Sequence, residues 1–411
     1  MKETLPTLSL RERDRRWKLI RDLMSNKGLA CLIVAGLSGR EEFDGYLSNE
    51  SANGIVVFPL EGEPTYLCWA GTRVLRSKEN AQRVENSWIE DVRVGASGPG
   101  VVAVLKERGF ETQTVGVVGI EIGSPQQPEG YVPFKTWSYV LSHLPKASFI
   151  DVSRDFCDLI MVKSDEELAL VRRSARIGER ACEALLATTK LGVGEGEMAA
   201  AVVQEIFSSG AGTRMPNIIL HTGVENLSWG PPLWTYRAQP PRRVQKGDVV
   251  LSEVFVIYGG LETQQQMCLA LSPVAQVDLE CAEVARRSYE AGLRALCPGK
   301  KFREVAEAME EPLREAGCWH LTPLIHSLNP LTWVGPTNVG IDQVLEIPKF
   351  GGMEQPDFPT GEDWIIKPGM VFELEPNACR GKHRINIGGT VIVSEDGVEE
   401  LNELATQMRI V

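Results

Sequence analysis

Two segments of the chain, KGDVVLSEVF and KPGMVFELEP, repeat one pattern and constrain the fold more than any other feature. In each, a glycine opens a short apolar run and a glutamate follows six positions later, which pairs Gly247 with Glu253 and Gly369 with Glu375. The alternative is that the two strands are unrelated and merely begin after similar turns, in which case only the turn would be shared. The matched carboxylates therefore favour an internal αβ/αβ duplication, with both glutamates directed at one cleft.

Helical segments accompany the repeated strands. Ser164 precedes a long helical pattern and Glu167 follows three residues later, which is the signature of a capping box at a helix start. Further helical patterns cover residues 195–210, 277–296 and 302–316. Because helices and antiparallel strands mix here, residues 157–411 are predicted to form an α+β domain.

Residues 1–156 show a different alternation, of short apolar strands with a helix. The strand-like runs are 30–36, 54–60, 64–70 and 114–122, and the helical run is 101–110. This order predicts an α/β layer domain. The segment 123–130 is rich in Pro, Gly and Gln and is predicted to be a surface loop.

The length and charge of the chain limit its class and its partners. With 411 residues, the chain is longer than one hydrophobic core usually fills, so we expect two or three domains. Its 43 basic and 55 acidic residues give a net charge of -12, which opposes binding to nucleic acid or to an anionic membrane. No apolar run approaches the ~18 residues of a membrane span.

The amino-terminal segment and the cysteines point to one location. The segment MKETLPTLSLRERDRRWK has no apolar core of a signal peptide. The nine cysteines are scattered and include no CxxC pair, which is typical of reduced, buried thiols. We therefore expect a cytoplasmic protein.

Five segments carry a resemblance to a known family. They are IMVKSDEELALVRRSARIGERA, RRVQKGDVVLSEVFVIYGG, IHSLNP, KPGMVFELEPNA and GGTVIVSEDGVEELN. In their sequence, order and spacing, the chain resembles the family of creatinase, prolidase, aminopeptidase P and methionine aminopeptidase. The resemblance implies a pita-bread C-terminal domain with duplicated αβ halves at 157–411. It also implies a creatinase-type α/β N-terminal domain at 1–156, and creatinase is closest in layout.

Peptidases of this family hold two divalent metals on two Asp, one His and two Glu, so the resemblance identifies five positions to compare. Glu253, His326 and Glu375 retain side chains of the ligand type. The other two positions, Gln264 and Gly388, are the ones that bridge the metals in the family, and they carry no carboxylate. The remaining set is too small for two hard cations. The prediction is no metal and no other cofactor, with a single divalent metal on the three retained residues as the alternative.

Creatinase works without metals, by acid–base chemistry on a small guanidinium compound, and His326 and Glu375 match its retained His and Glu. Its catalytic His falls near Gly230 and its second Glu falls at Gln266, while its carboxylate-binding arginines find no match. The resemblance therefore does not carry creatine over as the substrate. Gln264 and Gln266 are alternate members of one row, so both are expected to point into the site and bind substrate.

The surroundings of the candidates support chemistry independently of the resemblance. Glu253 and Glu375 each lie in an apolar strand, where a carboxylate is costly unless it is paired or functional. Two facing carboxylates would raise the pKa of one of them, which leaves one acid and one base near neutral pH. His326, in a turn rich in Pro and Asn, is expected to donate a proton or anchor substrate. Glu373 is expected to be a solvated strand residue.

A histidine and three aromatic residues complete the candidate site. His221 is a candidate replacement for the missing catalytic His, and a structural, hydrogen-bonding His is the alternative. Trp229, Trp234 and Tyr236 are candidates for a substrate-binding wall that would contact a cation through its ring faces. A simple packed loop is the alternative for these three.

The leading interpretation is a hydrolase that cleaves a C–N bond of a small polar or zwitterionic metabolite by metal-independent acid–base catalysis. Three alternatives stay open. They are a metal-dependent Xaa-Pro aminopeptidase or dipeptidase, a lyase using the same groups, and a pseudoenzyme that binds a ligand or a protein. A homodimer is also expected, because longer family members place one subunit's first domain over the partner's cleft, and the polar loop 39–53 could cap it.

Overall fold

The computed structural model describes residues 5–37, 39–50, 53–82, 87–121, 130–214, 217–227, 229–345 and 363–411. These residues form two compact units. The first is Thr7–Met161, and the second comprises the rest of the described chain. No helix within these ranges is both long and apolar enough to cross a membrane.

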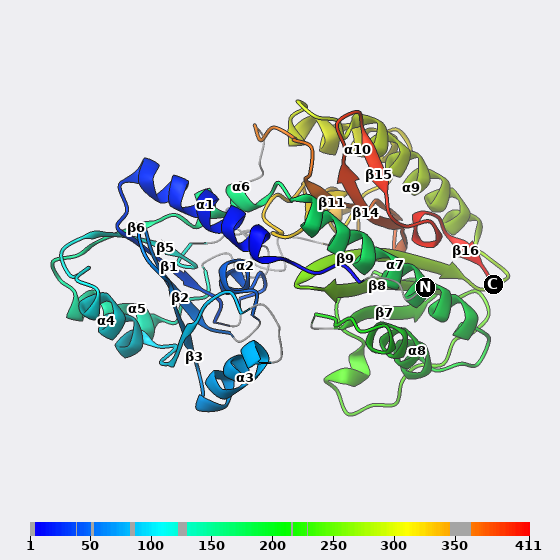
Figure 1. Ribbon diagram of the computed structural model, residues 1–411. Helices are drawn as coiled ribbons and strands as arrows, with labels where there is room; N and C mark the ends of the chain where they lie inside the picture. Colours follow the sequence, from blue (N-terminus) through cyan, green and yellow to red (C-terminus); the bar gives the residue numbers. More distant parts are fainter. Residues whose placement is uncertain are drawn as a thin grey trace. The chain divides into compact units, whose positions relative to one another are not determined.

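The first unit is built on a mixed six-stranded sheet (Figure 1). Its elements are α1 (Leu10–Lys27), β1 (Cys31–Ala35), α2 (Phe43–Ser48), β2 (Ile55–Pro59), β3 (Thr65–Cys68), α3 (Gly71–Gln82), β4 (Asp91–Val94), α4 (Gly98–Glu107), β5 (Thr114–Val118), α5 (Phe134–His143), β6 (Ser148–Asp151) and α6 (Ser153–Ile160). The strand order is β4-β3-β2-β1-β5-β6, with β2 antiparallel to both its neighbours and the other pairs parallel. The predicted strands and helix of this α/β domain are confirmed.

Both faces of this sheet are covered, because alternate side chains of a strand point to opposite faces. On β1, Leu32 and Val34 join the hydrophobic cluster that α1, α2 and α6 complete. Ile33 and Ala35 join the opposite cluster, which α4 and α5 complete. The sheet is therefore apolar on both sides.

The first unit ends later than the predicted boundary at residue 156. Its last helix, α6, buries Phe156, Cys157 and Ile160 in the same cluster as α1 and α2, so the helix belongs to this unit. The segment 39–53, predicted as a polar loop, contains α2, whose Phe43 is buried in that cluster. Of the loop predicted at 123–130, all but the last residue lies outside the described ranges.

The second unit contains the helices and strands of the α+β half. Its elements are α7 (Asp165–Thr188), α8 (Glu195–Ser208), β7 (Ile218–Gly223), η1 (Leu233–Thr235), β8 (Val249–Tyr258), β9 (Leu261–Ala270), α9 (Gln276–Ala295), α10 (Phe302–Glu315), β10 (Ile325–Ser327), η2 (Ile341–Gln343), β11 (Val371–Leu374), β12 (Asn377–Arg380), β13 (His383–Asn386), β14 (Gly388–Val393), β15 (Val398–Glu400), η4 (Leu404–Thr406) and β16 (Arg409–Ile410). The helices predicted from the sequence are confirmed within one or two residues.

The sheet of the second unit shows the predicted duplication. Its strands follow the order β10-β11-β14-β9-β8-β7, with β15 beside β14 and β16 beside β9. The half α7-α8-β7-β8-β9 matches the half α9-α10-β10-β11-β14, strand for strand, about the centre of the sheet. Glu253 on β8 and Glu375 directly after β11 therefore occupy equivalent places.

The long helix α7 packs closely on the centre of this sheet. It begins with the predicted capping box, in which the Ser164 hydroxyl accepts a hydrogen bond from the Glu167 backbone N–H and the Glu167 carboxylate accepts one from Ser164. Further along α7, a Cβ on Gly178 would lie 2.1 Å from the Gln265 side-chain oxygen. A side chain at position 178 would therefore displace the Gln265 amide, which packs directly against α7 at this glycine.

Candidate active site

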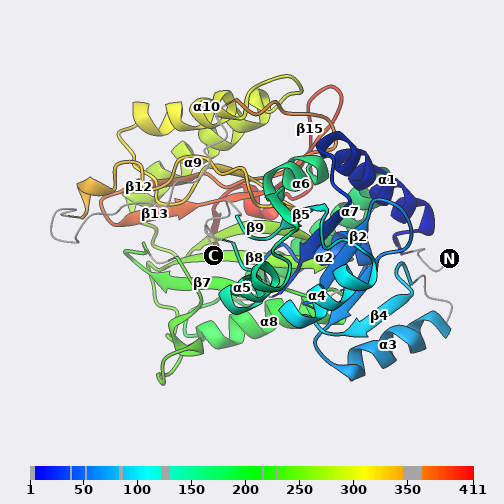
Figure 2. The same cartoon turned by 90° about the vertical axis from the view of Figure 1, so that its left-hand side faces the viewer.

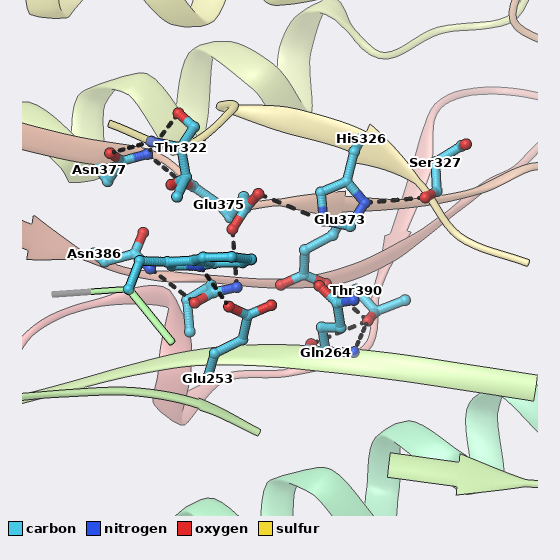
Figure 3. Close-up of polar contacts among 12 residues, drawn as sticks. Glu253, Gln264, Thr322, His326, Ser327, Glu373, Glu375, Asn377, Asn386 and Thr390 are labelled. Carbon is cyan, nitrogen blue, oxygen red and sulfur yellow. Dashed lines mark hydrogen bonds and ion pairs between the residues drawn. The ribbon is translucent and has the colours of Figure 1, made fainter. Parts of the chain in front are cut away.

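Strand register gathers polar side chains on one face of the eight-stranded sheet. Glu253 on β8 is the cross-strand partner of Gln266 on β9, and cross-strand partners share a face. On the other side of the sheet centre, Glu373 on β11 pairs with Thr390 on β14 and with His326 on β10. We call this surface the site face. Figure 3 shows side chains from these strands converging on one region.

One amide joins the two glutamates of the duplication. Gln266 Nε2 donates a hydrogen bond of 3.0 Å to Glu375 Oε2, and the same amide hydrogen-bonds to the Glu253 carboxylate. Asn386 Nδ2 donates to Gln266 Oε1 at 2.8 Å and fixes the orientation of the amide. Trp229 Nε1 donates to Glu253 Oε2 at 3.2 Å. Glu253 and Glu375 are thus held close together by neutral donors.

His326 is the third member of this arrangement. Its Nε2 lies 3.4 Å from Glu375 Oε1, as Figure 3 shows, and its Nδ1 lies 3.0 Å from the Ser327 carbonyl oxygen. A carbonyl can only accept, so Nδ1 carries a proton and Nε2 is the nitrogen that can take or return one. The pair can therefore pass a proton between an imidazole and a carboxylate.

Burial dominates the protonation of the carboxylates. It raises the pKa of Glu253 to about 7, and the charge of Glu262 adds to this effect. Burial and the charge of Glu253 raise the pKa of Glu375 well above its ordinary value. Arg384 opposes both shifts as a buried cation, and its Nη2 donates to Thr322 Oγ1 at 3.3 Å. The arrangement can hold one carboxylic acid beside one carboxylate.

Glu373 corrects the expectation of a solvated strand residue. It is fully buried, with an exposed fraction of 0%, because it lies on the site face at the middle of the sheet. Thr390 Oγ1 donates to its Oε2 at 2.9 Å, and burial together with the charge of Glu375 raises the pKa of Glu373 well above its ordinary value. The neighbouring Gln264 donates to Glu262 Oε1 at 2.6 Å.

The other predicted site residues divide into those on the site face and those away from it. Gln264 and Gln266 both point to that face, whereas Gln265 points to α7, so the expected alternation is observed. His221 on β7 shares the face with Glu253, and its Nε2 donates to the Gly230 carbonyl at 2.9 Å. Burial lowers the pKa of His221, which suits a neutral donor that holds the loop beside Trp229.

Two aromatic residues of the predicted substrate wall have other surroundings. Trp234 packs against the hydrophobic cluster between α7, α8 and the sheet. Tyr236 is 57% exposed, and the Arg237 guanidinium lies 5.7 Å from its ring centroid. Of the three predicted wall residues, the structure thus brings Trp229 to a carboxylate of the site face, and substrate binding by any of them stays a prediction.

The ligand set of a dinuclear metal centre can be compared with these residues. Between Glu253 and Glu375, the chain places the N–H donors of Gln266, where a bridging ion would need an oxygen. At Gly388, a Cβ would lie 2.0 Å from the Leu374 carbonyl oxygen, so a carboxylate side chain cannot begin there without a backbone shift. Throughout the described ranges, no three His, Cys, Asp or Glu side chains gather in a way that could hold a metal ion. The residues present do not fit a dinuclear centre.

Sequence reasoning missed three side chains of the site. Arg384 and Asn386 lie on β13 and reach Thr322 and Gln266, and Glu262 lies beside Gln264. A charged residue among apolar ones, the signal used for Glu375, is missing at Arg384, whose neighbours are His383 and Ile385. Asn386 and Glu262 give no such signal, because uncharged amides and strand-end carboxylates are common on surfaces.

Comparison with known proteins adds four findings. Residues 169–395 match the model of metallopeptidase family M24. The chain is 25% identical to a creatinase from a Bacillus species over 97% of its own length and 92% of the relative. It is 21% identical to an ectoine hydrolase from Halomonas elongata over 96% of both chains. The fold is similar to that of a prolidase from Thermococcus sibiricus, with a TM-score of 0.73, 17% identity and coverage of 97% and 99% of the two chains.

Proposed function

Because this chain belongs to metallopeptidase family M24 and is a hydrolase of its creatinase and aminopeptidase group, we propose that it cleaves a C–N bond of a small polar or zwitterionic metabolite by metal-independent acid–base catalysis. The full-length similarity to a creatinase and an ectoine hydrolase supports a small molecule, rather than a peptide, as the substrate. The finer assignment rests on the chain's own site residues.

One observation carries the proposal. Gln266 places an amide N–H group between Glu253 and Glu375, with 3.0 Å from its Nε2 to Glu375 Oε2. An amide positions two carboxylates and neutralises neither, so burial and mutual repulsion favour a state with one acid and one base.

In the proposed reaction, Glu375 is the general base that takes a proton from the attacking water. His326, at 3.4 Å from Glu375, receives that proton or returns it to the leaving nitrogen. Glu253 supports this exchange as the second carboxyl group of the pair, held by Gln266 and Trp229. Trp229 closes the site over Glu253.

Elemental analysis of the protein purified without added metal tests the proposal, together with turnover measured with and without a chelator. We expect far less than one metal ion per chain and no loss of turnover. Stoichiometric metal, with turnover lost in chelator and restored by the metal, would contradict the proposal.

A metal-dependent Xaa-Pro peptidase is the second candidate, because the matching family is one of metallopeptidases. Glu253, His326 and Glu375 are the retained residues of the ligand type, although the described structure does not gather them into a metal site. The same chelator experiment separates the two functions, and a panel of Xaa-Pro dipeptides beside small amides and amidines identifies the substrate class.

A further inference from the structure

The Trp229 indole joins the solvent-exposed surface to the most buried part of the site. Its Nε1 donates a hydrogen bond of 3.2 Å to Glu253 Oε2 on the site face. The Trp229 side chain is nevertheless half-exposed, at 49%, whereas Glu253 is only 4% exposed. An indole nitrogen carries one proton and can only donate, so this hydrogen bond occupies all of its polar capacity. One edge of the ring therefore covers a buried carboxyl group while the rest of the ring contacts solvent.

The backbone on either side of Trp229 is anchored to the sheet. Asn226 Nδ2 donates to the His221 carbonyl at 3.0 Å, and His221 Nε2 donates to the Gly230 carbonyl at 2.9 Å. His221 lies on β7, which follows β8, the strand of Glu253, at one end of the sheet order (Figure 2). Because the ring is exposed on one side, it can leave Glu253 by side-chain rotation while these backbone contacts stay in place.

A buried carboxyl oxygen at the position of Glu253 Oε2 needs a donor. Leaving such an oxygen unpaired costs the desolvation free energy of the group, and Trp229 removes that cost when no ligand is bound. A molecule that takes the place of the indole restores the hydrogen bond only if it brings an N–H or O–H group of its own. A site of this kind rejects ligands that lack the donor, because they leave its buried polar group unpaired.

We propose that Trp229 is a specificity-determining residue, whose indole N–H occupies the position on Glu253 that an N–H group of the substrate takes. Substrate binding displaces the ring, and the substrate N–H replaces its hydrogen bond. This inference rests on the proposed function, in which the substrate is a small metabolite with a C–N bond. It adds that the group bound at Glu253 is an N–H donor and that the free protein keeps this position closed with its own side chain.

Competition between the indole and a ligand lowers the apparent affinity for the ligand. The ligand binds only those molecules in which Trp229 has left Glu253, so the apparent dissociation constant is the intrinsic one divided by their fraction. Trp229→Phe keeps an aromatic ring and removes the donor. Since a hydrogen bond contributes a modest net free energy, the affinity for an N–H ligand should rise roughly two- to tenfold.

Isothermal titration calorimetry of the full-length protein, purified without added metal, tests this expectation. The probe is acetamidinium chloride, whose planar cation offers N–H groups to a carboxylate, and tetramethylammonium chloride is the matched cation without N–H groups. Acetamidinium should bind Trp229→Phe roughly two- to tenfold more tightly than the wild type. Glu253→Gln should weaken its binding, and tetramethylammonium should bind none of these proteins. Trp69→Phe changes a tryptophan of the first unit that is 60% exposed, and it should match the wild type.

The opposite result identifies the competing explanation. If the Trp229 ring held cations on its face, Trp229→Phe would weaken binding of acetamidinium, and tetramethylammonium would bind too. That result would overturn the proposal, as would equal affinity in the wild type and Trp229→Phe, undiminished binding in Glu253→Gln, or no binding of acetamidinium. Calorimetry requires no turnover, so a chelator experiment that contradicts the proposed function leaves these outcomes unchanged.

Tryptophan fluorescence follows the displacement itself. The chain has nine tryptophans, so the difference between the wild type and Trp229→Phe isolates the emission of Trp229. Saturating acetamidinium should shift the wild-type emission to longer wavelength, because the indole exchanges a carboxylate for solvent. Trp69→Phe should show the same shift and Trp229→Phe should show none. A wild-type spectrum that does not shift would mean that the ring stays on Glu253, contrary to the proposal.

Discussion

The two large sheets of the described chain are both buried, but they bury different side chains. In the first unit, β1 and β2 consist of apolar residues that are almost entirely inaccessible. In the second unit, β9 carries five consecutive polar residues, Glu262 to Gln266, and each has an exposed fraction of 1% or less. Buried polar groups in a strand lower stability unless they are paired. The first sheet therefore stabilises its unit through apolar burial, whereas the second sheet buries polar groups at a cost in stability.

The largest effect that would test this difference is on turnover. Glu375→Gln keeps the volume and the contact with Gln266 but removes the basic oxygen, so turnover should fall roughly 10²- to 10⁴-fold. The melting temperature should stay the same or rise, because a buried carboxylate is removed. The measurement is turnover of a substrate identified by a metabolite screen, with a melting curve of the same sample. A folded variant with wild-type turnover would show that Glu375 is not the general base.

A substitution in the core of the first sheet should lower stability and leave turnover unchanged. Phe58 on β2 is fully buried, and its ring lies edge-on to Trp17 with the centroids 5.6 Å apart. Phe58→Ala should lower the free energy of unfolding by about 3–5 kcal/mol through lost contacts and a cavity. Turnover per folded molecule should be unchanged. Denaturant unfolding measures the loss of stability, and an assay of the folded variant without denaturant measures turnover. Lost turnover in fully folded Phe58→Ala would contradict the idea that the first sheet contributes stability and not catalysis.

Asp44 gives the first unit a pH dependence of its own. It accepts hydrogen bonds from the Tyr66 hydroxyl at 2.7 Å and the Gly54 N–H at 2.9 Å, yet burial raises the pKa of Asp44 to about 6. Because the folded state holds the proton more tightly, the stability from this group is present below about pH 4 and is lost as the pH rises through about 6.

A shift of this size corresponds to roughly 3 kcal/mol between the two limits. Asp44→Asn cannot titrate, so its free energy of unfolding should change less between pH 4.5 and 7.5 than that of the wild type. Denaturant unfolding at the two pH values measures the difference. Equal changes in both proteins would show that Asp44 is not responsible.

The smallest expected effect is a gain of stability in the second sheet. Glu373→Gln removes a fully buried carboxyl group whose pKa burial raises well above its ordinary value, and it keeps an oxygen for Thr390. The free energy of unfolding at pH 8 should rise by about 1–2 kcal/mol. Glu395→Gln, in the exposed turn after β14, is the control and should change stability little. A loss of stability in Glu373→Gln would mean that the hydrogen bonds of Glu373 fully offset the free-energy cost of burying its carboxyl group.

Local pattern explains why part of the fold and site could be predicted. The capping box at Ser164 and the repeat that pairs Glu253 with Glu375 are short-range signals, and the structure contains both features. Glu373 was predicted wrongly, although it shares its face with Glu375, because nothing in one strand shows how deeply that face is covered. Depth depends on neighbouring strands that lie far away in the sequence.

Arg384 and α2 show the same limit. β13 has only four residues, too few to reveal an alternating pattern, so the burial of Arg384 follows from packing on α9 and on the loop of Thr322. The helix α2 lies in a polar segment and is anchored by hydrogen bonds from Gly54 and Tyr66 to Asp44. Both contacts are long-range, and residue order alone does not specify them.

Gly388 limits how a metal ligand could be engineered into this site. Its φ of 153° lies in a region that favours glycine, and a Cβ there would meet the Leu374 carbonyl oxygen at 2.0 Å. A glutamate at this position would therefore have to separate β11 from β14 before its carboxylate reached the site face. Installing a bridging carboxylate here thus requires a change in the pairing of these two strands together with the substitution itself.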